Sequence, residues 1–143
     1  MPAPLFTHAL VPVSSPKDAK ATMRAIRPYL ESAGGDLTVV NVIEKAGGAP
    51  DKASVEQREA YAREIFDSAR DALADSELTL TTEIRYGTDV AETIIETAHE
   101  LDASAIVFTP RGGSRWLRLL TGDVALSLVS ESDLPVIALP DHD

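Results

Sequence analysis

The stretch "ELTLTTEIRYGTDVAETIIETAHELDASAIVF", residues 77–108, decides the fold class, because strand and helix spacing follow one another in it. Residues 77–86 alternate with period two, which predicts a half-exposed strand at a sheet edge. Residues 88–102 predict a helix whose apolar face is made of Ala91, Ile94, Ile95 and Ala98. Residues 103–108 are wholly apolar in "ASAIVF", which predicts a central strand. A strand, a helix and a second strand in this order indicate parallel pairing.

Upstream of this unit, the same alternation begins near the amino terminus. Residues 8–13, "HALVPV", predict a strand, and a helix follows with Ser15 as its N-cap, Pro16 in its first turn and Asp18 at capping-box spacing. Pro28 lies inside this helix, so we expect a kink or a break near Arg27. The glycine pair 34–35 ends the helix, and residues 36–43, "DLTVVNVI", predict a strand covered on both faces.

The remaining segments complete the alternation. Residues 55–74 form an amphipathic pattern, residues 123–132 predict a short helix, and residues 135–140, "PVIALP", predict a last strand. The fold class is therefore α/β, with a parallel sheet that has helices on both faces. We find no linker or repeat in the 143 residues, which predicts a single domain over 1–143.

The net charge of −10, from 23 acidic and 13 basic residues, limits the partners of this chain. Nonspecific binding to nucleic acid or to an anionic membrane needs a surplus of Lys and Arg, so we expect neither. An acidic, lysine-poor composition favours adaptation to high salt, as in a halophilic archaeon, over an ordinary acidic protein. The absence of cysteine and of an amino-terminal signal or spanning segment predicts a cytoplasmic protein without membrane insertion.

Signatures of catalysis are absent from the sequence. There is no GxxxxGK[ST], GxSxG or HExxH pattern, and His8, His99 and His142 have no neighbour at metal-ligand spacing. We therefore expect no metal site and no enzyme activity, although slow ATP hydrolysis stays open as an alternative.

The loop 109–123, "TPRGGSRWLRLLTGD", has the outline of an anion site after a buried strand. Gly112 and Gly113 permit a tight backbone, and Gly122 lies at the start of a predicted helix, where free N–H groups attract anions. Arg111, Arg115 and Arg118 add positive charge. The alternative is a plain turn whose arginines balance nearby carboxylates.

The order of these motifs resembles the universal stress protein family over nearly the whole chain. The resemblance rests on "HALVPVSSPKDAKATMRAI", "GGDLTVVNVIE", "IRYGTDVAETIIETAHELDASAIVF" and "RGGSRWLRLLTGDVALSLVSESDLPVIALP". It implies the adenine nucleotide alpha hydrolase-like, Rossmann-like fold, with five parallel strands in the order 3-2-1-4-5. It also implies a homodimer, here through the predicted edge strand Pro135–Pro140. Many members of the family bind ATP, and others do not.

The nucleotide-binding members carry the pattern G-x2-G-x9-G-[ST], and this chain departs from it. Gly112 and Gly122 match its second and third glycines, with Arg111 beside Gly112, whereas Thr109 and Asp123 stand at the first glycine and at the Ser/Thr position. Ser14 stands where those members have an aspartate near the adenine. The same alignment places five more residues beside the base or the loop: Pro12, Val13, Val42, Phe108 and Val124.

Two of these departures predict a weakened phosphate site. Thr109 introduces a Cβ where glycine lets the backbone approach a ligand. Asp123 repels phosphate, and as a helix cap it could occupy the N–H groups that phosphate would use. We therefore expect a small regulatory or stress-response protein that acts as a dimer with an unidentified protein partner and has no cofactor. The alternative is an ATP-binding universal stress protein that uses the nucleotide as a switch.

Overall fold

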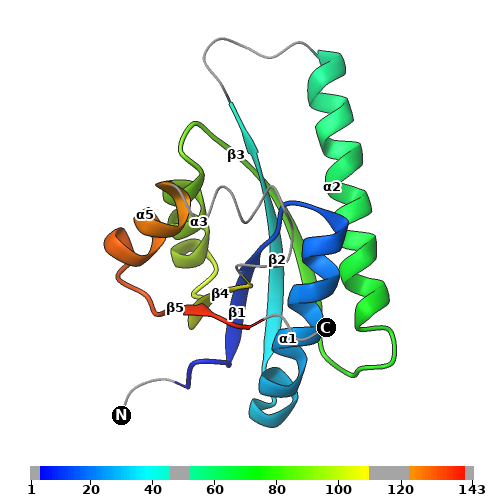
Figure 1. The fold of residues 1–143 in the computed structure, drawn as a ribbon, viewed down its shortest axis with the longest axis vertical. Helices are drawn as coiled ribbons and strands as arrows, with labels where there is room; N and C mark the ends of the chain where they lie inside the picture. The colour runs from blue at the N-terminus through cyan, green and yellow to red at the C-terminus, as the bar shows by residue number, and fades with distance from the viewer. Residues whose placement is uncertain (1–3, 46–51, 110–122, 141–143) are drawn as a thin grey trace.

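Five parallel strands form the sheet in the order β3-β2-β1-β4-β5 (Figure 1). The computed structural model describes residues 4–45, 52–109 and 123–140. Its elements are β1 (His8–Pro12), α1 (Pro16–Ala33), β2 (Asp36–Glu44), α2 (Lys52–Ala72), β3 (Leu80–Gly87), α3 (Val90–Glu100), β4 (Ala105–Phe108), α5 (Asp123–Glu131) and β5 (Val136–Ala138). The predicted fold class and strand order are confirmed.

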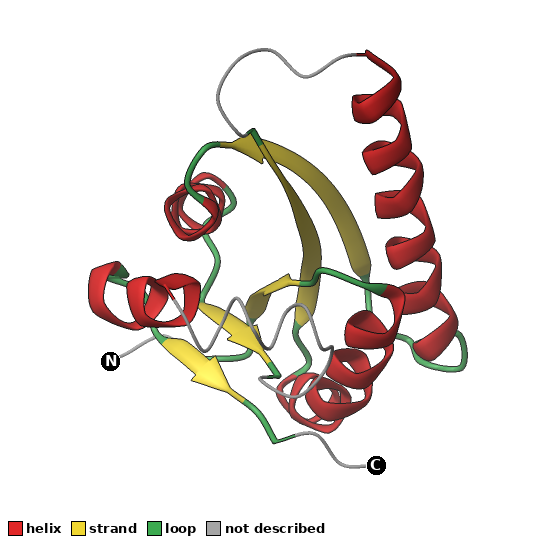
Figure 2. Cartoon of the chain, turned by 45° about the horizontal axis from the view of Figure 1, so that its top comes forward, coloured by secondary structure: helices red, strands yellow, loops and turns green. Residues whose placement is uncertain are grey.

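Helices cover both faces of this sheet, α1 and α2 on one side and α3 and α5 on the other (Figure 2). Alternate residues of each central strand supply the two faces. Ala9, Val11 and Val13 pack toward the side of α1 and α2. Leu10 packs into the other cluster with Ile94 of α3. A strand that is covered on both faces needs apolar side chains in both directions, which explains why β1, β2 and β4 are mostly apolar.

The amino-terminal cap and the glycine end of α1 lie where the sequence predicts them, and α3 has an amino-terminal cap of the same kind. Ser15 Oγ accepts the N–H of Asp18 at 3.0 Å at the start of α1, and Asp89 Oδ1 accepts the N–H of Glu92 at 3.0 Å at the start of α3. Gly34 ends α1 with φ of 67°, a left-handed conformation that favours glycine.

The break expected near Pro28 does not occur, because α1 continues through it to Ala33. Pro28 and Arg24 lie on the exposed side of the helix, where water can hydrogen-bond the carbonyl group that loses its N–H partner. The opposite side is fixed by fully buried Met23, Ile26 and Leu30. Burial of this apolar stripe on both sides of the proline keeps the helix in one piece.

The predicted strand positions are confirmed, although each strand differs by one to three residues at one or both ends. The third strand lies at one edge of the sheet and β4 lies inside it, between β1 and β5. The third strand begins at Leu80 rather than at residue 77. The last strand is shorter than the predicted 135–140 and covers only Val136–Ala138. A proline at each end of that segment cannot donate to a sheet ladder, which limits the regular strand.

Candidate functional site

The candidate site lies at the carboxyl ends of β1 and β4, where the order of strands in the sheet reverses. From β1 the chain continues to β2 and β3 on one side, whereas β4 and β5 lie on the other. In open α/β sheets, ligands bind in the crevice that opens at such a switch point. The turn 13–15 and the end of β4 at Thr109 border this position in the described part of the chain.

The end of β1 is fixed by two hydrogen bonds to β2. The N–H of Val13 donates to the carbonyl of Val40 at 3.0 Å, and the Nδ2 group of Asn41 donates to the carbonyl of Val13 at 2.9 Å. Pro12 and Val13, at the end of β1, are buried. Asn41 was missed by the sequence analysis. The signal for it is a single amide in the otherwise apolar run "VVNVI".

Three of the predicted site residues pack together on the side of α3 and α5. Phe108 is 4% exposed at the end of β4, and Val42 of β2 and Val124 of α5 are partly buried against the same cluster. They belong to one apolar cluster that is made from three elements distant in sequence. Apolar residues at a switch point suit a planar apolar group better than a charged one.

On the other face, a buried chain of polar side chains connects β4 to α1. Thr109 Oγ1 lies 2.6 Å from Thr22 Oγ1, and Thr22 donates to Asp18 Oδ1 at 3.3 Å. The other carboxylate oxygen, Oδ2, accepts the N–H of Ser14 at 3.0 Å. Asp18, Thr22 and Thr109 are each 0% exposed. The hydroxyl of Thr109 is therefore directed at α1, inside the protein, and not into the approach that Thr109 was expected to narrow.

Asp18 and Thr22 are further residues that the sequence analysis did not assign to the site. Asp18 was predicted only as part of a capping box, and it does occupy that position. Its burial and its contact with Thr22 depend on how α1 packs against the end of β4. The four-residue spacing between the two is visible in the sequence, but Thr109 follows 87 residues after Thr22.

Ser14 lies next to this series of polar side chains, and its hydroxyl oxygen is buried. Within the described residues, Ser14 Oγ has no hydrogen-bond partner although it is buried. An unpaired buried hydroxyl costs about 1–3 kcal/mol. This side chain replaces the carboxylate that the family pattern has at this position, and it does not contribute a hydrogen bond to the fold there.

The structure describes only part of the predicted loop. Asp123 is the first residue of α5. Arg111, Gly112 and Gly122, and with them the proposed anion cradle, lie outside the described residues. The other predicted site residues lie in α5, or in or directly after β1, β2 and β4.

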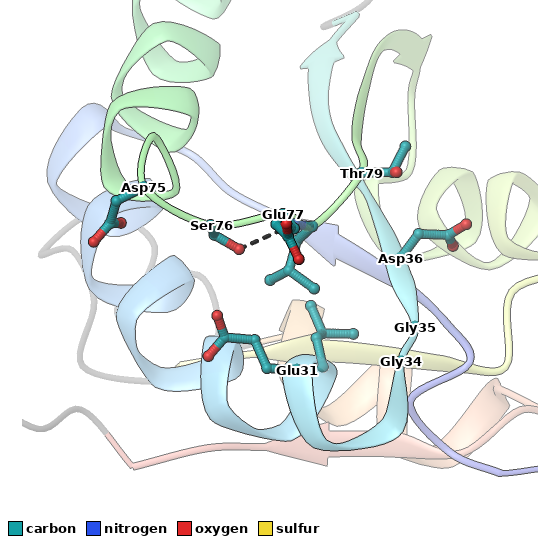
Figure 3. Close-up of a pocket in the computed structure, with 10 residues that line it drawn as sticks. Glu31, Gly34, Gly35, Asp36, Asp75, Ser76, Glu77 and Thr79 are labelled. Atoms are coloured by element: carbon teal, nitrogen blue, oxygen red, sulfur yellow. Dashed lines mark hydrogen bonds between the residues drawn. The ribbon is translucent and has the colours of Figure 1, made fainter.

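A hollow of about 730 Å³ lies at the opposite end of the sheet, between the last turn of α1 and the segment before β3 (Figure 3). Its lining includes four carboxylates, those of Glu31, Asp36, Asp75 and Glu77. Arg27 bonds two of them, Asp75 at 2.7 Å and Glu31 at 3.1 Å. This hydrogen bond from Arg27 lowers the pKa of the Asp75 carboxyl. The excess of negative charge disfavours an anionic ligand here, and the location is remote from the switch point.

Two histidines join elements by contacts with carboxylates. The ring of His8 contacts Asp36 and Thr38 in β2, and His99 Nε2 lies 2.7 Å from Asp133 Oδ1. Among the described residues, no cluster of His, Cys, Asp and Glu has the arrangement of a metal site. His142 lies outside the described residues. No helix in the same described part of the chain has the length and apolar character needed to cross a membrane.

Known proteins share both the sequence pattern and the fold. A model of the universal stress protein family matches residues 5–140. A protein of that family from Burkholderia pseudomallei has 22% identity and a TM-score of 0.75 over 97% of this chain and 99% of its own.

Two other similar structures are titled as nucleotide complexes. A universal stress protein from Archaeoglobus fulgidus in complex with dAMP has 20% identity and a TM-score of 0.65, over 95% of this chain and 99% of its own. A family protein from Arabidopsis thaliana with AMP bound has 17% identity and a TM-score of 0.69, over 95% and 92%. No curated protein sequence matched. Because the family model covers nearly the whole sequence, and the strand order agrees with it, this chain belongs to the universal stress protein family.

Proposed function

We propose that this chain is a small regulatory protein of the stress response, that it acts as a homodimer on a protein partner, and that it binds ATP weakly or not at all. The observation that carries the proposal is that Asp123 opens α5. The first turn of a helix attracts anions through its free N–H groups and its dipole. A carboxylate-bearing residue at this point brings its own negative charge to the place where a phosphate group would have to bind.

The residues at the switch point fit one half of a nucleotide better than the other. The apolar cluster that contains Val42, Phe108 and Val124 suits a planar base better than a phosphate group. The phosphate end faces the start of α5, and repulsion between a partly desolvated carboxylate and a triphosphate costs on the order of a few kcal/mol. Each 1.4 kcal/mol weakens binding about tenfold. We therefore expect an ATP affinity in the millimolar range or below detection.

The second candidate is a nucleotide-operated switch, with slow hydrolysis as a further step. It is favoured by the two similar structures whose titles name dAMP and AMP. AMP carries fewer phosphate charges than ATP, so repulsion by Asp123 weakens its binding less. A preference for AMP over ATP in the wild-type protein would support this candidate.

Calorimetry with magnesium-ATP and with AMP tests the first proposal. The variant Asp123→Ser should bind magnesium-ATP at least about tenfold more tightly than wild type, because it restores the hydroxyl of the family pattern. Glu131→Gln is the matched control, since it removes one exposed carboxylate from the other end of the same helix. Micromolar ATP binding by wild type would instead establish the switch.

Thr109→Gly is not part of this test, although glycine is the residue of the family pattern. The hydroxyl of Thr109 is hydrogen-bonded to Thr22 inside the protein. Its removal would leave Thr22 without this partner and would confuse a loss of stability with a change in binding.

The dimer is proposed from the free edge of β5. This strand is the last in the sheet, and an edge with unpaired backbone groups favours pairing with a second copy. The preceding helix exposes two apolar side chains, Leu126 at 68% and Val129 at 66%, which a second copy would cover. Light scattering in the salt that the protein prefers should give twice the mass of the chain at micromolar concentration.

A proline substitution in β5 tests which strand forms the dimer. The N–H of Leu139 donates to Phe108, and the carbonyl of Pro135 accepts from Ile106, so residues of odd number bond to β4. By alternation, the N–H of Ala138 points to the free edge. Ala138→Pro should shift the protein to monomer, while Ala138→Val should remain a dimer. A dimeric proline variant would place the interface elsewhere.

The remaining parts of the proposal concern location and mechanism. We propose a cytoplasmic protein without catalytic activity, whose effect depends on contact with a partner protein. Wild-type protein at high concentration, incubated with magnesium-ATP, should release no more phosphate than the Asp123→Asn variant does. An assay of released phosphate without radioisotope measures both. Phosphate release that depends on Asp123 would contradict this and assign hydrolysis to the chain.

A further inference from the structure

The ladder between β1 and β4 is short at the switch point. Their register pairs Ala9 with Ala105 and Leu10 with Ile106. Both strands continue beyond these pairs, β1 to Pro12 and β4 to Phe108. Past Leu10 and Ile106, the described residues of β1 and β4 form no further ladder pair that would fix the separation of their ends.

The buried polar chain supplies a connection at this place. It begins at Thr109, directly after β4, and passes through Thr22 and Asp18 of α1. It ends at the N–H of Ser14, two residues after β1. The first turns of α1 thus lie against both strand ends and bond to each of them.

We assign the direction of the bonds from Asp18, whose carboxylate also accepts the N–H of Ser14. A threonine hydroxyl has one hydrogen, and we assign that of Thr22 to Asp18. With this assignment, the hydrogen in the 2.6 Å contact between Thr22 and Thr109 comes from Thr109. Thr109 donates to Thr22, Thr22 donates to Asp18, and Ser14 donates to Asp18 from the other side. All bonds are directed toward one carboxylate, so a change at Thr109 alters what Asp18 can offer to Ser14.

We propose that Asp18, Thr22 and Thr109 are positioning residues, which hold the carboxyl ends of β1 and β4 at a fixed separation and so set the width of the crevice at the switch point. The polar chain acts across the two strands because its bonds are buried and share one acceptor. This role concerns the same site as the proposed function, but it holds whether or not a nucleotide binds there.

Amide hydrogen exchange of the full-length protein tests the proposal without any ligand. The probe is the N–H of Ser14, which Thr109 does not bond directly. Thr109→Val removes the hydroxyl with little change of volume. It should raise the exchange rate of the Ser14 amide about threefold to tenfold, the range expected for coupling between residues of one network. Thr109→Ser keeps a hydroxyl and should restore the wild-type rate.

An internal reference and a matched control separate positioning from general stability. The N–H of His8 donates to Ser104 Oγ at 2.9 Å at the opposite end of β1, and its exchange rate is the reference. Thr97→Val is the control, because Thr97 is 1% exposed and its hydroxyl bonds only the carbonyl of Thr93 in the same helix among the contacts described. It should change the His8 and Ser14 rates in parallel.

The result that overturns the proposal is equally specific. If Thr109→Val leaves the ratio of the Ser14 and His8 exchange rates at its wild-type value, Thr109 does not position the end of β1. Thr22→Val gives a second measurement, since it breaks the chain at its centre, and it should change the same ratio at least as much as Thr109→Val. An unchanged ratio in Thr22→Val would also contradict the proposal.

Discussion

The two ends of the sheet are held together in different ways. At the carboxyl end, Asp18, Thr22 and Thr109 are 0% exposed and form directed hydrogen bonds. At the amino end, the side chains around the hollow include exposed ion pairs, such as that of Arg27 with Asp75. Buried hydrogen bonds fix geometry, because leaving one partner unpaired is costly, whereas exposed ion pairs contribute little and are screened by salt. The size of the hollow at the amino end therefore does not make that end the better candidate site.

The largest expected effect on stability is a steric clash at the amino end of the sheet. It would show that the backbone around Gly35 is also rigid. A Cβ at Gly35 would lie 1.8 Å from the carbonyl oxygen of Phe6. Backbone must move to admit it, so Gly35→Ala should lower the free energy of unfolding by about 3 kcal/mol or more. Gly34→Ala is the control, with open space around its Cβ but φ of 67°, and should cost about 1 kcal/mol. Urea denaturation measures both.

Equal losses for the two glycine variants would break this interpretation. They would mean that the segment before β2 can shift away from Phe6 at little cost. The amino end would then be adjustable throughout, and the contrast with the carboxyl end would become sharper.

The second prediction concerns the buried chain at the carboxyl end. Thr22→Val removes a donor to Asp18 and an acceptor for Thr109, so it should lower the free energy of unfolding by about 1–3 kcal/mol. Thr97→Val should cost less, because the carbonyl that loses the Thr97 hydroxyl bond belongs to its own helix. Denaturant titrations of both variants provide the comparison. Equal losses of unfolding free energy in the two variants would indicate that the hydrogen bonds of Thr22 contribute no more than those of any buried threonine.

A third prediction uses salt, which acts on exposed charges at both ends. With a net charge of −10, screening should relieve more repulsion than it weakens attraction. We expect the thermal midpoint to rise along a potassium chloride series up to about 2 M, by a few degrees for roughly 1 kcal/mol. A flat or falling series would remove the halophilic interpretation of the composition.

The smallest expected effect is that of the exposed ion pair at the amino end. The hydrogen bond from Arg27 lowers the pKa of Asp75 below its ordinary value of 3.8. A carboxyl whose pKa is lowered by folding adds stability above that ordinary value, and this contribution disappears as the pH falls through the lower, folded-state pKa. The small stability advantage of wild type over Asp75→Asn should therefore be present at pH 7 and vanish in strong acid.

Thermal unfolding of wild type and Asp75→Asn at several pH values measures this advantage. The same pair in high salt is the control, because screening should reduce the difference. A difference that persists unchanged in acid or in salt would show that Asp75 stabilises the hollow by something other than its charge.

The sequence by itself determined the elements and most of their places in the sheet. The N-cap Ser15 and the C-cap Gly34 act within a few residues, so local patterns identify them. Alternation in β3 and the apolar run of β4 predicted an edge strand and an interior strand, because the periodicity of a strand records which of its faces are covered. The family and strand order followed from motifs spread along the whole chain.

Only the tertiary structure decided how the candidate site is held. The bond between Thr22 and Thr109 joins residues 87 positions apart, and Asn41 reaches the carbonyl of Val13 from a neighbouring strand. Pro28 is tolerated because the packed side of α1 outweighs one lost hydrogen bond. No local pattern encodes these facts, since each depends on which surfaces meet after the chain has folded. Sequence spacing fixes which groups a segment presents, and packing fixes which partners those groups find.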